Sequence, residues 1–272
     1  MVVSVVPGHF KAEKVTMKRF RAYQLIFKSL GIRQSLLFIL CNNLNYEREF
    51  YARFDRKDFL VRSCTNDLYI LNSVLNGDEY ADIEAIILNS GYEDLVIDAG
   101  AHLGGSAERL RKIFPQNKIV LIEPEKRNFL LLERNVSTLK NKILINAALV
   151  PGELMGQELQ LKDRTGRSGF TIVQGALDNP YALTIQNVPT ISLRKILIDQ
   201  NAKEIAFLKV DVEGAEKMIF SSDKDLSEII HVAYIELHDR VVEGCTETVR
   251  DFFKNTHKEI VCSGEKLLYV RK

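Results

Sequence analysis

The sequence has almost no net charge. Its 272 residues include 37 lysines and arginines against 36 aspartates and glutamates, which leaves a formal charge of +1. A chain with this balance creates no general field that would concentrate nucleic acid or an anionic membrane around it. The composition therefore argues against an enzyme that acts on nucleic acid, without excluding a local basic patch.

Paired cysteines and long apolar runs are also missing. Cys41, Cys64, Cys245 and Cys262 form no C-x-x-C pair, so zinc and thioredoxin-like sites lack their usual spacing. Isolated cysteines fit a reducing compartment. The first ten residues have no basic region, and the apolar runs there and at 35–41 are too short for a signal peptide or a membrane span. The sequence predicts a cytoplasmic protein without a membrane span.

Residues 1–90 are predicted to form a helical lead-in that could act as a lid over the acceptor. Phe20, Tyr23, Phe27 and Leu30 recur at three- and four-residue steps, which predicts a helix over 11–30 with one packed face. Four basic residues fall on the opposite face of this helix: Lys14, Lys18, Arg21 and Lys28. They form either a solvent-exposed face or a surface that binds an acidic partner or membrane headgroups. Further elements are predicted as helices at 34–44, 68–75 and 82–88 and a short strand within 59–67.

Residues 91–272 alternate short apolar runs with amphipathic helices, which is typical of parallel βαβ units. Strands are predicted at Leu95–Asp98, Ile119–Glu123, Ile143–Asn146, Ala206–Asp211 and Val232–Leu237. Helices are predicted at about 105–114, 127–139, 193–199, 215–220 and 246–256. An edge-like strand is predicted at Glu158–Lys162, and an antiparallel hairpin at 259–270 is predicted to end the sheet.

The segment Val96–Gly105 is the first candidate ligand-binding loop. A buried strand runs into Asp98, and Gly100 and Gly104 then allow a tight turn and a close approach to a ligand before a helix begins. The spacing is not G-x-G-x-x-G. A carboxylate before the first glycine would repel a pyrophosphate but could meet the ammonium of a bound amino acid. A purely structural turn is the alternative.

A second acidic residue follows at the end of the next strand. Glu123, before Pro124, comes 25 residues after Asp98 (123 minus 98), where a carboxylate can accept hydrogen bonds from ribose hydroxyls. Two acids around a glycine loop predict a nucleoside site at the switch point of an open sheet. The ligand would carry a ribose and a cationic group but no pyrophosphate. Asn146 and Ala147, at the next strand end, are candidates for contact with an adenine ring, with plain packing as the alternative.

The acids after the fourth and fifth strands are candidates for catalysis. Asp211, Glu213 and Glu216 place three carboxylates within six residues, although acids in a first helical turn also suit the helix dipole. Glu236 and His238 alternate onto one face of the next strand end, and a histidine beside a carboxylate is a candidate general base. No metal ion is predicted here. A hard cation on Asp211, Glu236 and His238 is the alternative.

These segments resemble the FkbM family of S-adenosylmethionine-dependent methyltransferases. The resemblance covers most of residues 91–238 and rests on Val96–Gly105, Glu123-Pro124, Asn146–Ala148, Leu208–Glu216 and Ile235–His238. It implies an α/β fold with a Rossmann-like seven-stranded methyltransferase sheet, mostly parallel, preceded by an N-terminal helical extension. S-adenosylmethionine is then the methyl donor. The implied cofactor contacts are Asp98, Gly100, His102, Gly104, Glu123, Pro124, Asn146, Ala147 and Asp211.

The predicted activity is O-methylation of a hydroxyl on a small molecule, a sugar or another secondary metabolite in natural-product biosynthesis. His238 or Glu236 is predicted to accept the proton, while Asp211 and Glu213 orient the acceptor. Acceptor choice is assigned to residues 1–45 and 151–189.

Other readings stay open at this point. N-methylation of a peptide side chain is the alternative activity, so the acceptor is a small molecule, a glycan or a peptide. Methylation of nucleic-acid bases is disfavoured, because Asp211-Val-Glu-Gly214 stands where an Asn/Asp-Pro-Pro-aromatic turn is typical. A nicotinamide dehydrogenase and a non-catalytic binding module on the same fold are the other classes. A homo-oligomer is left open.

Overall fold

The computed structural model describes residues 8–77, 80–87, 92–163, 169–173, 183–262 and 264–272. The chain forms two compact units, Met1–Tyr69 and Ile70–Lys272. This boundary differs from the predicted one at residue 90. The reason is that Ile83 and Ile87 of helix α3 (Ala81–Ile87) share a buried apolar cluster with Val96 of the second unit.

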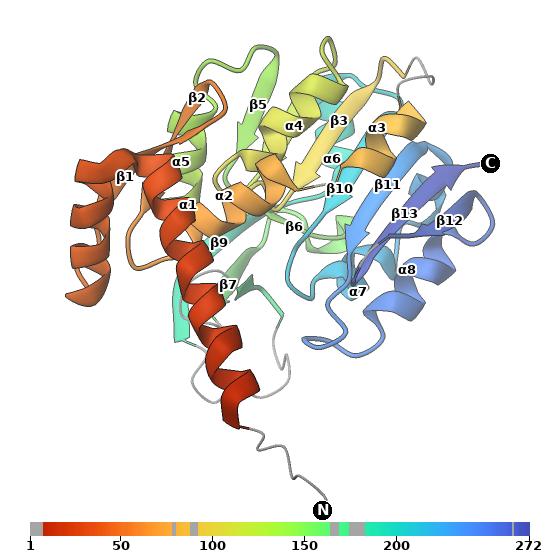
Figure 1. The fold of residues 1–272 in the computed structure, drawn as a ribbon. Helices are drawn as coiled ribbons and strands as arrows, with labels where there is room; N and C mark the ends of the chain where they lie inside the picture. Colours follow the sequence, from red (N-terminus) through yellow and green to blue (C-terminus); the bar gives the residue numbers. More distant parts are fainter. Residues whose placement is uncertain (1–7, 78–79, 88–91, 164–168, 174–182, 263) are drawn as a thin grey trace, which may run out of the picture. The chain divides into compact units, whose positions relative to one another are not determined.

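The first unit pairs a long interrupted helix with a hairpin. Helix α1 (Gly8–Asn43) is broken at Gly31, whose φ of 70° and ψ of 166° are not helical. This break lies between the two predicted helices, 11–30 and 34–44. Strands β1 (Glu49–Phe54) and β2 (Lys57–Arg62) pair antiparallel, and helix α2 (Asp67–Asn76) follows (Figure 1). The ring of Phe38 packs edge-on against Phe50 of the hairpin at 5.2 Å.

The predicted packed stripe on the first helix is wrong for three of its four members. Leu30 is buried, but Phe20, Tyr23 and Phe27 are exposed, with Phe20 at 61%. Periodicity identifies an apolar face and does not say what covers it. Residues 20–43 are also long and apolar enough to cross a membrane by length and composition, at a mean hydropathy of 1.3 with 33% of the most apolar window buried.

The second unit is built on a seven-stranded sheet in the order β12-β13-β11-β10-β3-β4-β5. Its strands are β3 (Leu95–Ala99), β4 (Ile119–Ile122), β5 (Lys142–Ile145), β10 (Ile205–Val210), β11 (Ile230–Glu236), β12 (His257–Val261) and β13 (Lys266–Arg271). The five strands from β5 to β11 are parallel, and β13 is antiparallel to both of its neighbours. The predicted strands and the antiparallel ending are confirmed. Chain order reverses between β3 and β10, which is the switch point of the sheet.

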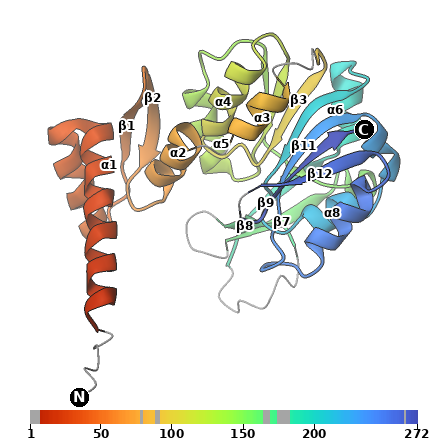
Figure 2. The same ribbon diagram turned by 45° about the vertical axis from the view of Figure 1, so that its right-hand side comes forward.

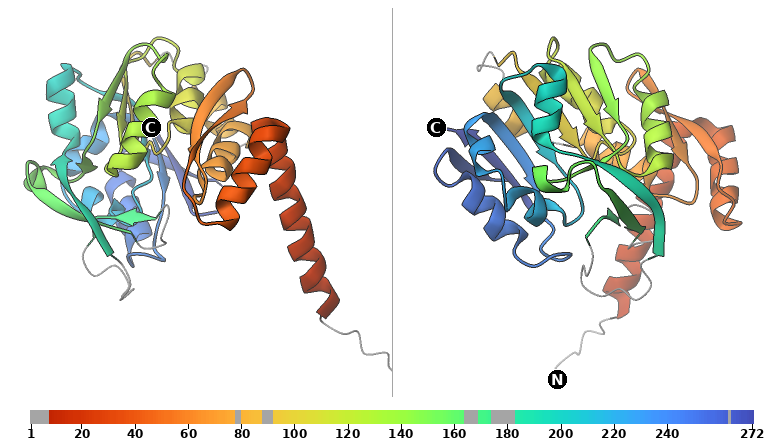
Figure 3. Two further views of the ribbon diagram at one scale, coloured as in Figure 1. Left: turned by 90° about the vertical axis from the view of Figure 1, so that its left-hand side faces the viewer. Right: turned by 180° about the vertical axis from the view of Figure 1, so that it is seen from behind.

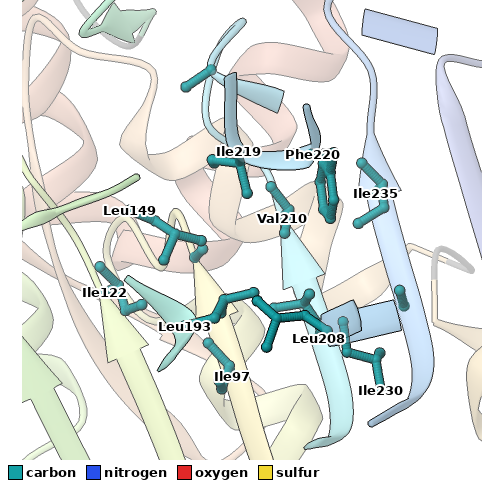
Figure 4. Close-up of a cluster of buried hydrophobic side chains, with 14 of the residues drawn as sticks. Ile97, Ile122, Leu149, Leu193, Leu208, Val210, Ile219, Phe220, Ile230 and Ile235 are labelled. Atoms are coloured by element: carbon teal, nitrogen blue, oxygen red, sulfur yellow. The ribbon is translucent and has the colours of Figure 1, made fainter. Parts of the chain in front are cut away.

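Helices cover both faces of this sheet, because alternate residues of each strand point to opposite sides. Val96 and Phe207 face the cluster that includes residues of α3, α4 (Gly105–Ile113) and α5 (Lys126–Asn135). Ile97 and Leu208 face the cluster that includes α6 (Leu193–Gln200), α7 (Glu216–Phe220) and α8 (Cys245–Phe253). Figures 2 and 3 show the two helical layers, and Figure 4 shows part of the second cluster.

A second, smaller sheet follows β5 in the chain, with the order β6-β9-β7-β8. Its strands are β6 (Ala148–Leu149), β7 (Glu158–Asp163), β8 (Phe170–Thr171) and β9 (Leu183–Ile191). The predicted strand at Glu158–Lys162 is confirmed as β7, but it belongs to this sheet and not to the edge of the large one. Leu161, Ile172 and Val188 join the buried cluster that packs on the large sheet.

The first unit offers a direct test of a buried ion pair. Asp67 accepts hydrogen bonds from the Arg62 guanidinium at 2.8 and 3.0 Å, and both side chains are at least 93% buried. We expect Asp67→Ala to lower the free energy of unfolding by about 3–5 kcal/mol, because a buried guanidinium loses its counter-charge. Asp58→Ala removes the exposed partner of Arg53 and should cost about 0–1 kcal/mol. Urea unfolding followed by circular dichroism measures both, and equal losses would contradict the expectation.

Candidate active site

A cavity of about 330 Å³ lies at the carboxyl ends of the central parallel strands. This size falls within the range of small-molecule sites. It is lined by the loop after β3, by Glu123 after β4, by Asp211 after β10 and by Glu236 at the end of β11. Ser73 and Val74 of α2 and several apolar side chains of the small sheet complete the wall. The cavity therefore sits where open α/β sheets bind ligands.

The loop after β3 depends on two glycines with left-handed backbone. Gly100 has φ of 94°, and a Cβ atom there would lie 2.0 Å from the Asp211 carbonyl oxygen. Gly104 has φ of 89° and precedes the first turn of α4, where a Cβ would meet Val136 at 2.6 Å. The Gly100 N–H also donates to the Ile122 carbonyl at 3.0 Å. The two glycines thus allow the turns after β3, β4 and β10 to approach one another.

Asp98 does not line the cavity itself, whereas Lys209, which contacts Asp98, does. The Asp98 carboxylate is fully buried, accepts from Ser106 Oγ at 2.5 Å and accepts from Lys209 Nζ at 3.1 Å. Lys209 and Ser106 line the cavity. Burial lowers the pKa of Lys209, but Asp98 and Asp211 raise it well above its usual value overall. The ammonium that Asp98 was predicted to meet in a ligand is supplied in this structure by Lys209.

Glu123 lines the cavity and is held by the loops after β3 and β4. Its carboxylate accepts from the backbone N–H of His102 at 2.9 Å and of Glu125 at 3.0 Å, and from Asn128 Nδ2 at 3.4 Å. Burial raises the pKa of Glu123 to about 7, even though these hydrogen bonds act in the opposite direction. His102 and Pro124 also line the cavity, and their contact with the cofactor stays a prediction.

The end of β5 contributes differently from the prediction. Asn146 Nδ2 donates to the carbonyls of Glu123 at 2.8 Å and Pro124 at 3.0 Å. Asn146 therefore braces the turn after β4. Ala148 and Leu149, further along the chain, line the cavity, and contact of Asn146 or Ala147 with an adenine ring stays a prediction.

The four predicted catalytic residues lie close together: Asp211, Glu213 and Glu236 line the cavity, and the buried His238, which does not line it, approaches Asp211 and Glu213. His238 Nδ1 lies 2.7 Å from Glu216 Oε1, and both side chains are buried. His238 Nε2 lies 3.9 Å from Asp211 Oδ1 and 3.7 Å from Glu213 Oε2. Glu213 has φ of 51°, a left-handed conformation that is uncommon for a residue with a side chain. Such strain is typical of functional sites.

Protonation separates the two candidate bases. Burial lowers the pKa of His238, but the hydrogen bond to Glu216 and the charges of Glu213 and Asp211 raise it to about 9 overall. At neutral pH its ring therefore carries a proton and is a poor base. Burial and the nearby Asp211 raise the pKa of Glu236, which lines the cavity directly. Because a raised pKa makes a carboxylate a better proton acceptor, Glu236 is the stronger candidate.

The roles of several site residues were not predicted from the sequence. Lys209 carried a signal, because a lysine within a buried strand requires a charged partner. Glu216 was noted as the third acid after β10, but its hydrogen bond to His238 depends on the fold. Leu161, Phe170 and Ile172, in or directly after strands of the small sheet, line the cavity and had no distinguishing pattern.

A glycine loop, a carboxylate after β4 and a seven-stranded sheet with one antiparallel strand define an S-adenosylmethionine-dependent methyltransferase. The methyltransferase FkbM domain family matches residues 98–261, which is more than half of the chain. The chain belongs to the FkbM methyltransferase family, and its methyl donor is S-adenosylmethionine. Among curated proteins, no sequence matches significantly.

Solved structures show distant likenesses. SMU.1697c from Streptococcus mutans, in complex with SAH, is 10% identical with a TM-score of 0.41, over 71% of this chain and 98% of that one. An rRNA methylase from Streptococcus thermophilus is 12% identical with a TM-score of 0.38, over 70% and 92%. A precorrin-6y C5,15-methyltransferase from Geobacter metallireducens is 9% identical with a TM-score of 0.36, over 70% and 85%. Likenesses this distant do not indicate an acceptor, and the absence of a nucleic-acid acceptor stays a prediction.

The glycine loop generates a stability and binding test. Gly156 has φ of 82° with open space around it, whereas Gly100 combines φ of 94° with a backbone clash. We expect Gly156→Ala to cost about 1–2 kcal/mol from backbone strain alone. Gly100→Ala should cost about 2–5 kcal/mol, because overpacking adds to that strain, and should weaken binding of S-adenosylhomocysteine. Urea unfolding and calorimetric titration check this, and indistinguishable variants would argue against the assigned close approach.

Proposed function

We propose that the protein transfers a methyl group from S-adenosylmethionine to a hydroxyl of a small molecule, such as a sugar or another secondary metabolite. The observation that carries this proposal is that Glu123 and Glu236, the candidate proton acceptor, line the same cavity. The four cysteines are free thiols, which supports a reducing, cytoplasmic setting for the reaction.

The donor half of the cavity has the groups that S-adenosylmethionine requires. The Glu123 carboxylate is an acceptor for ribose hydroxyls, and the Gly100 turn leaves space where any side chain would collide. Lys209 presents an ammonium that suits the carboxylate of the methionine part. Bound S-adenosylmethionine supplies a sulfonium methyl, whose carbon–sulfur bond breaks as the new bond to the acceptor oxygen forms.

The acceptor half must position a hydroxyl and remove its proton. Glu236 lies at the cavity wall and, in our proposal, accepts that proton on its carboxylate. Lys266 Nζ lies 3.4 Å from Glu236 Oε2 and stabilises the ionised form before the acceptor binds. Asp211 and Glu213 orient the hydroxyl, and His238 holds these two carboxylates from behind. Positioning of this kind supplies much of the rate of a displacement reaction.

The wall of the acceptor half favours a compact, partly apolar acceptor. Leu161, Phe170 and Ile172, which lie in or directly after strands of the small sheet, line the same cavity as the carboxylates. A ring with one apolar face and several hydroxyls matches this combination of apolar and acidic lining. We propose that residues 151–189 set the acceptor; within this range, 164–168 and 174–182 lie outside the described residues.

An acceptor screen tests the activity directly. The full chain would be incubated with S-adenosylmethionine carrying a labelled methyl group and with sugars, phenolic and polyketide hydroxyls, peptides and RNA. We expect label in at least one hydroxyl compound and none in RNA or peptides. Label confined to RNA or peptide nitrogen would overturn the proposed acceptor class, and binding of the donor without transfer to any class would favour a non-catalytic module.

Donor binding is expected to depend on pH through Glu123. A carboxyl group with a pKa of about 7 is ionised above that pH and becomes protonated as the pH falls through it, which removes an acceptor for ribose hydroxyls. The neighbouring charged group is Glu125, whose carboxylate caps α5. We expect the affinity for S-adenosylhomocysteine to fall by up to about tenfold between pH 8 and pH 6. Glu123→Gln should bind weakly and without this slope in calorimetric titrations; an unchanged slope would exclude Glu123.

Turnover is expected to depend on the carboxylate of Glu236. Glu236→Gln should lower kcat by about 10²- to 10⁴-fold with little change in the affinity for S-adenosylhomocysteine, because it removes the proton acceptor and leaves the donor half intact. Glu133→Gln, an exposed position on α5, serves as the matched control and should leave kcat unchanged. A Glu236→Gln variant with full turnover would show that another group takes the proton.

A further inference from the structure

His238 has the arrangement of a metal ligand held by a second residue. Its Nδ1 is fixed by Glu216 at 2.7 Å, and the histidine side chain is 99% buried. Its Nε2 points to Asp211 Oδ1 and Glu213 Oε2 at 3.9 and 3.7 Å, beyond hydrogen-bond length. Histidine ligands typically donate their other ring N–H to a carboxylate, which fixes the orientation of the free nitrogen.

The spacing of the three ligand atoms suits one cation. Nε2 and the two carboxylate oxygens lie within 4.8 Å of one another. Ligands that surround a small divalent ion at about 2.0–2.3 Å are separated by roughly 3–4.5 Å, depending on their angle at the metal. Asp211 and Glu213 are 33% and 25% exposed, so water or an acceptor hydroxyl can reach the remaining positions.

A second cluster with the same donor types provides a contrast. Asp94, Glu204 and His231 also group together, but the Arg271 guanidinium contacts two of the three. Its Nη1 donates to Glu204 at 2.9 Å, and its Nη2 lies 3.5 Å from His231 Nε2. At the His238 cluster the basic groups stay farther away: Lys209 Nζ is 3.6 Å from Asp211, and Arg240 Nη2 is 3.9 Å from Glu213.

We propose that Asp211, Glu213 and His238 bind a hard divalent cation, Mg²⁺ or Mn²⁺, with Glu216 as the residue that positions the histidine. Two carboxylates and one imidazole favour such ions, and the bound ion displaces to solvent the proton that the His238 ring otherwise carries at neutral pH. The proposal departs from the sequence-based prediction of no metal ion. Its functional meaning rests on the proposed function, because the cation lies where it would bind the acceptor hydroxyl and lower the pKa of that hydroxyl.

Mn²⁺ alone tests this site on the full chain. Titration followed by electron paramagnetic resonance should show one tightly bound ion per chain. Asp211→Asn and Glu213→Gln, at partly exposed positions, should each weaken binding at least about tenfold, and Glu216→Gln by about 10–100-fold. His231→Gln, in the cluster that Arg271 contacts, is the matched control and should leave Mn²⁺ affinity unchanged.

Donor binding separates this proposal from the proposed function. S-adenosylhomocysteine titrations on Glu213→Gln and Glu216→Gln report the donor half and the fold independently of the metal, whereas Asp211 is itself an expected cofactor contact. Mn²⁺ affinity that survives both Asp211→Asn and Glu213→Gln, or that is lost in His231→Gln, would overturn the metal site. Failure to bind S-adenosylhomocysteine with intact Mn²⁺ binding would instead count against the methyltransferase site.

A separate observation concerns helix α1, which combines buried and exposed apolar residues. Ile26, Leu30, Phe38 and Cys41 are buried. Six large apolar residues before and after the break are exposed: Phe20, Tyr23, Phe27, Ile32, Leu36 and Leu40. Exposed apolar residues gathered on one element are typical of a surface that binds a partner or a membrane. The exposed set is called the outer face below.

Charge indicates what covers the outer face. Residues 8–43 contain seven lysines and arginines and one acid, which leaves 30 basic (37 minus 7) and 35 acidic (36 minus 1) residues for the rest of the chain. Arg21, Lys28 and Arg33 are exposed on the same helix. Apolar side chains together with basic ones are the pattern of helices that lie in the surface of an anionic membrane.

The break at Gly31 argues against a full crossing. The apolar part before it, residues 20–30, is about 16 Å long at 1.5 Å per residue, against a hydrocarbon core of about 30 Å. We infer that the outer face lies in the surface of an anionic lipid bilayer and does not span it.

Vesicle sedimentation tests this inference with the full chain. We expect the protein to pellet with phosphatidylcholine–phosphatidylserine vesicles and much less with phosphatidylcholine alone. Ile32→Glu together with Leu36→Glu should lower the partition coefficient by about tenfold or more. Ile198→Glu, at a position 74% exposed on α6, is the matched control and should have no effect. Equal pelleting by all variants would overturn the inference of membrane binding. A dimer in light scattering that dissociates in the variant with Ile32→Glu and Leu36→Glu would also overturn it.

Discussion

The buried ion pair between Lys209 and Asp98 joins the two central strands at the point where the cavity begins. Lys209 Nζ bonds the Asp98 carboxylate at 3.1 Å and the Gly100 carbonyl at 3.2 Å. Removing both charges from water costs several kcal/mol per ion, so the pair is a poor source of net stability. Its effect is positional: it holds the turn after β3 against β10, and through that turn it sets the distance between the donor and acceptor halves.

Burial gives the two halves of the cavity opposite electrical character. On the donor side, desolvation keeps the pKa of Glu123 near neutrality. A ligand that donates a further hydrogen bond to this carboxylate therefore favours its ionised form. On the acceptor side, Asp211, Glu213 and Glu216 surround His238 and favour a positive charge there, whether a proton or a metal ion. Both effects arise because few water molecules are available to screen these groups.

Much of the large sheet could be predicted from the sequence, because buried parallel strands are continuous apolar runs flanked by turns. Of the small sheet, β7 was predicted from its alternation, but β9 was not: it contains Thr184, Gln186, Asn187 and Pro189, and a proline within a run argues against a strand. The predicted site residues were found where an acid follows a buried strand. The roles of Lys209 and Glu216 depend on which strands become neighbours, and local pattern does not determine that.

The separate hydrogen-bonded ladder of the small sheet has a consequence for the history of such enzymes. Leu161 and Phe170 belong to it and Ile172 follows directly after β8, whereas Glu123 and Asp211 follow strands of the large sheet. Replacements or insertions in the small sheet leave the hydrogen bonds between the strands of the large sheet intact. Descendants of one ancestral chain can therefore diverge in what they modify while inheriting the donor half unchanged.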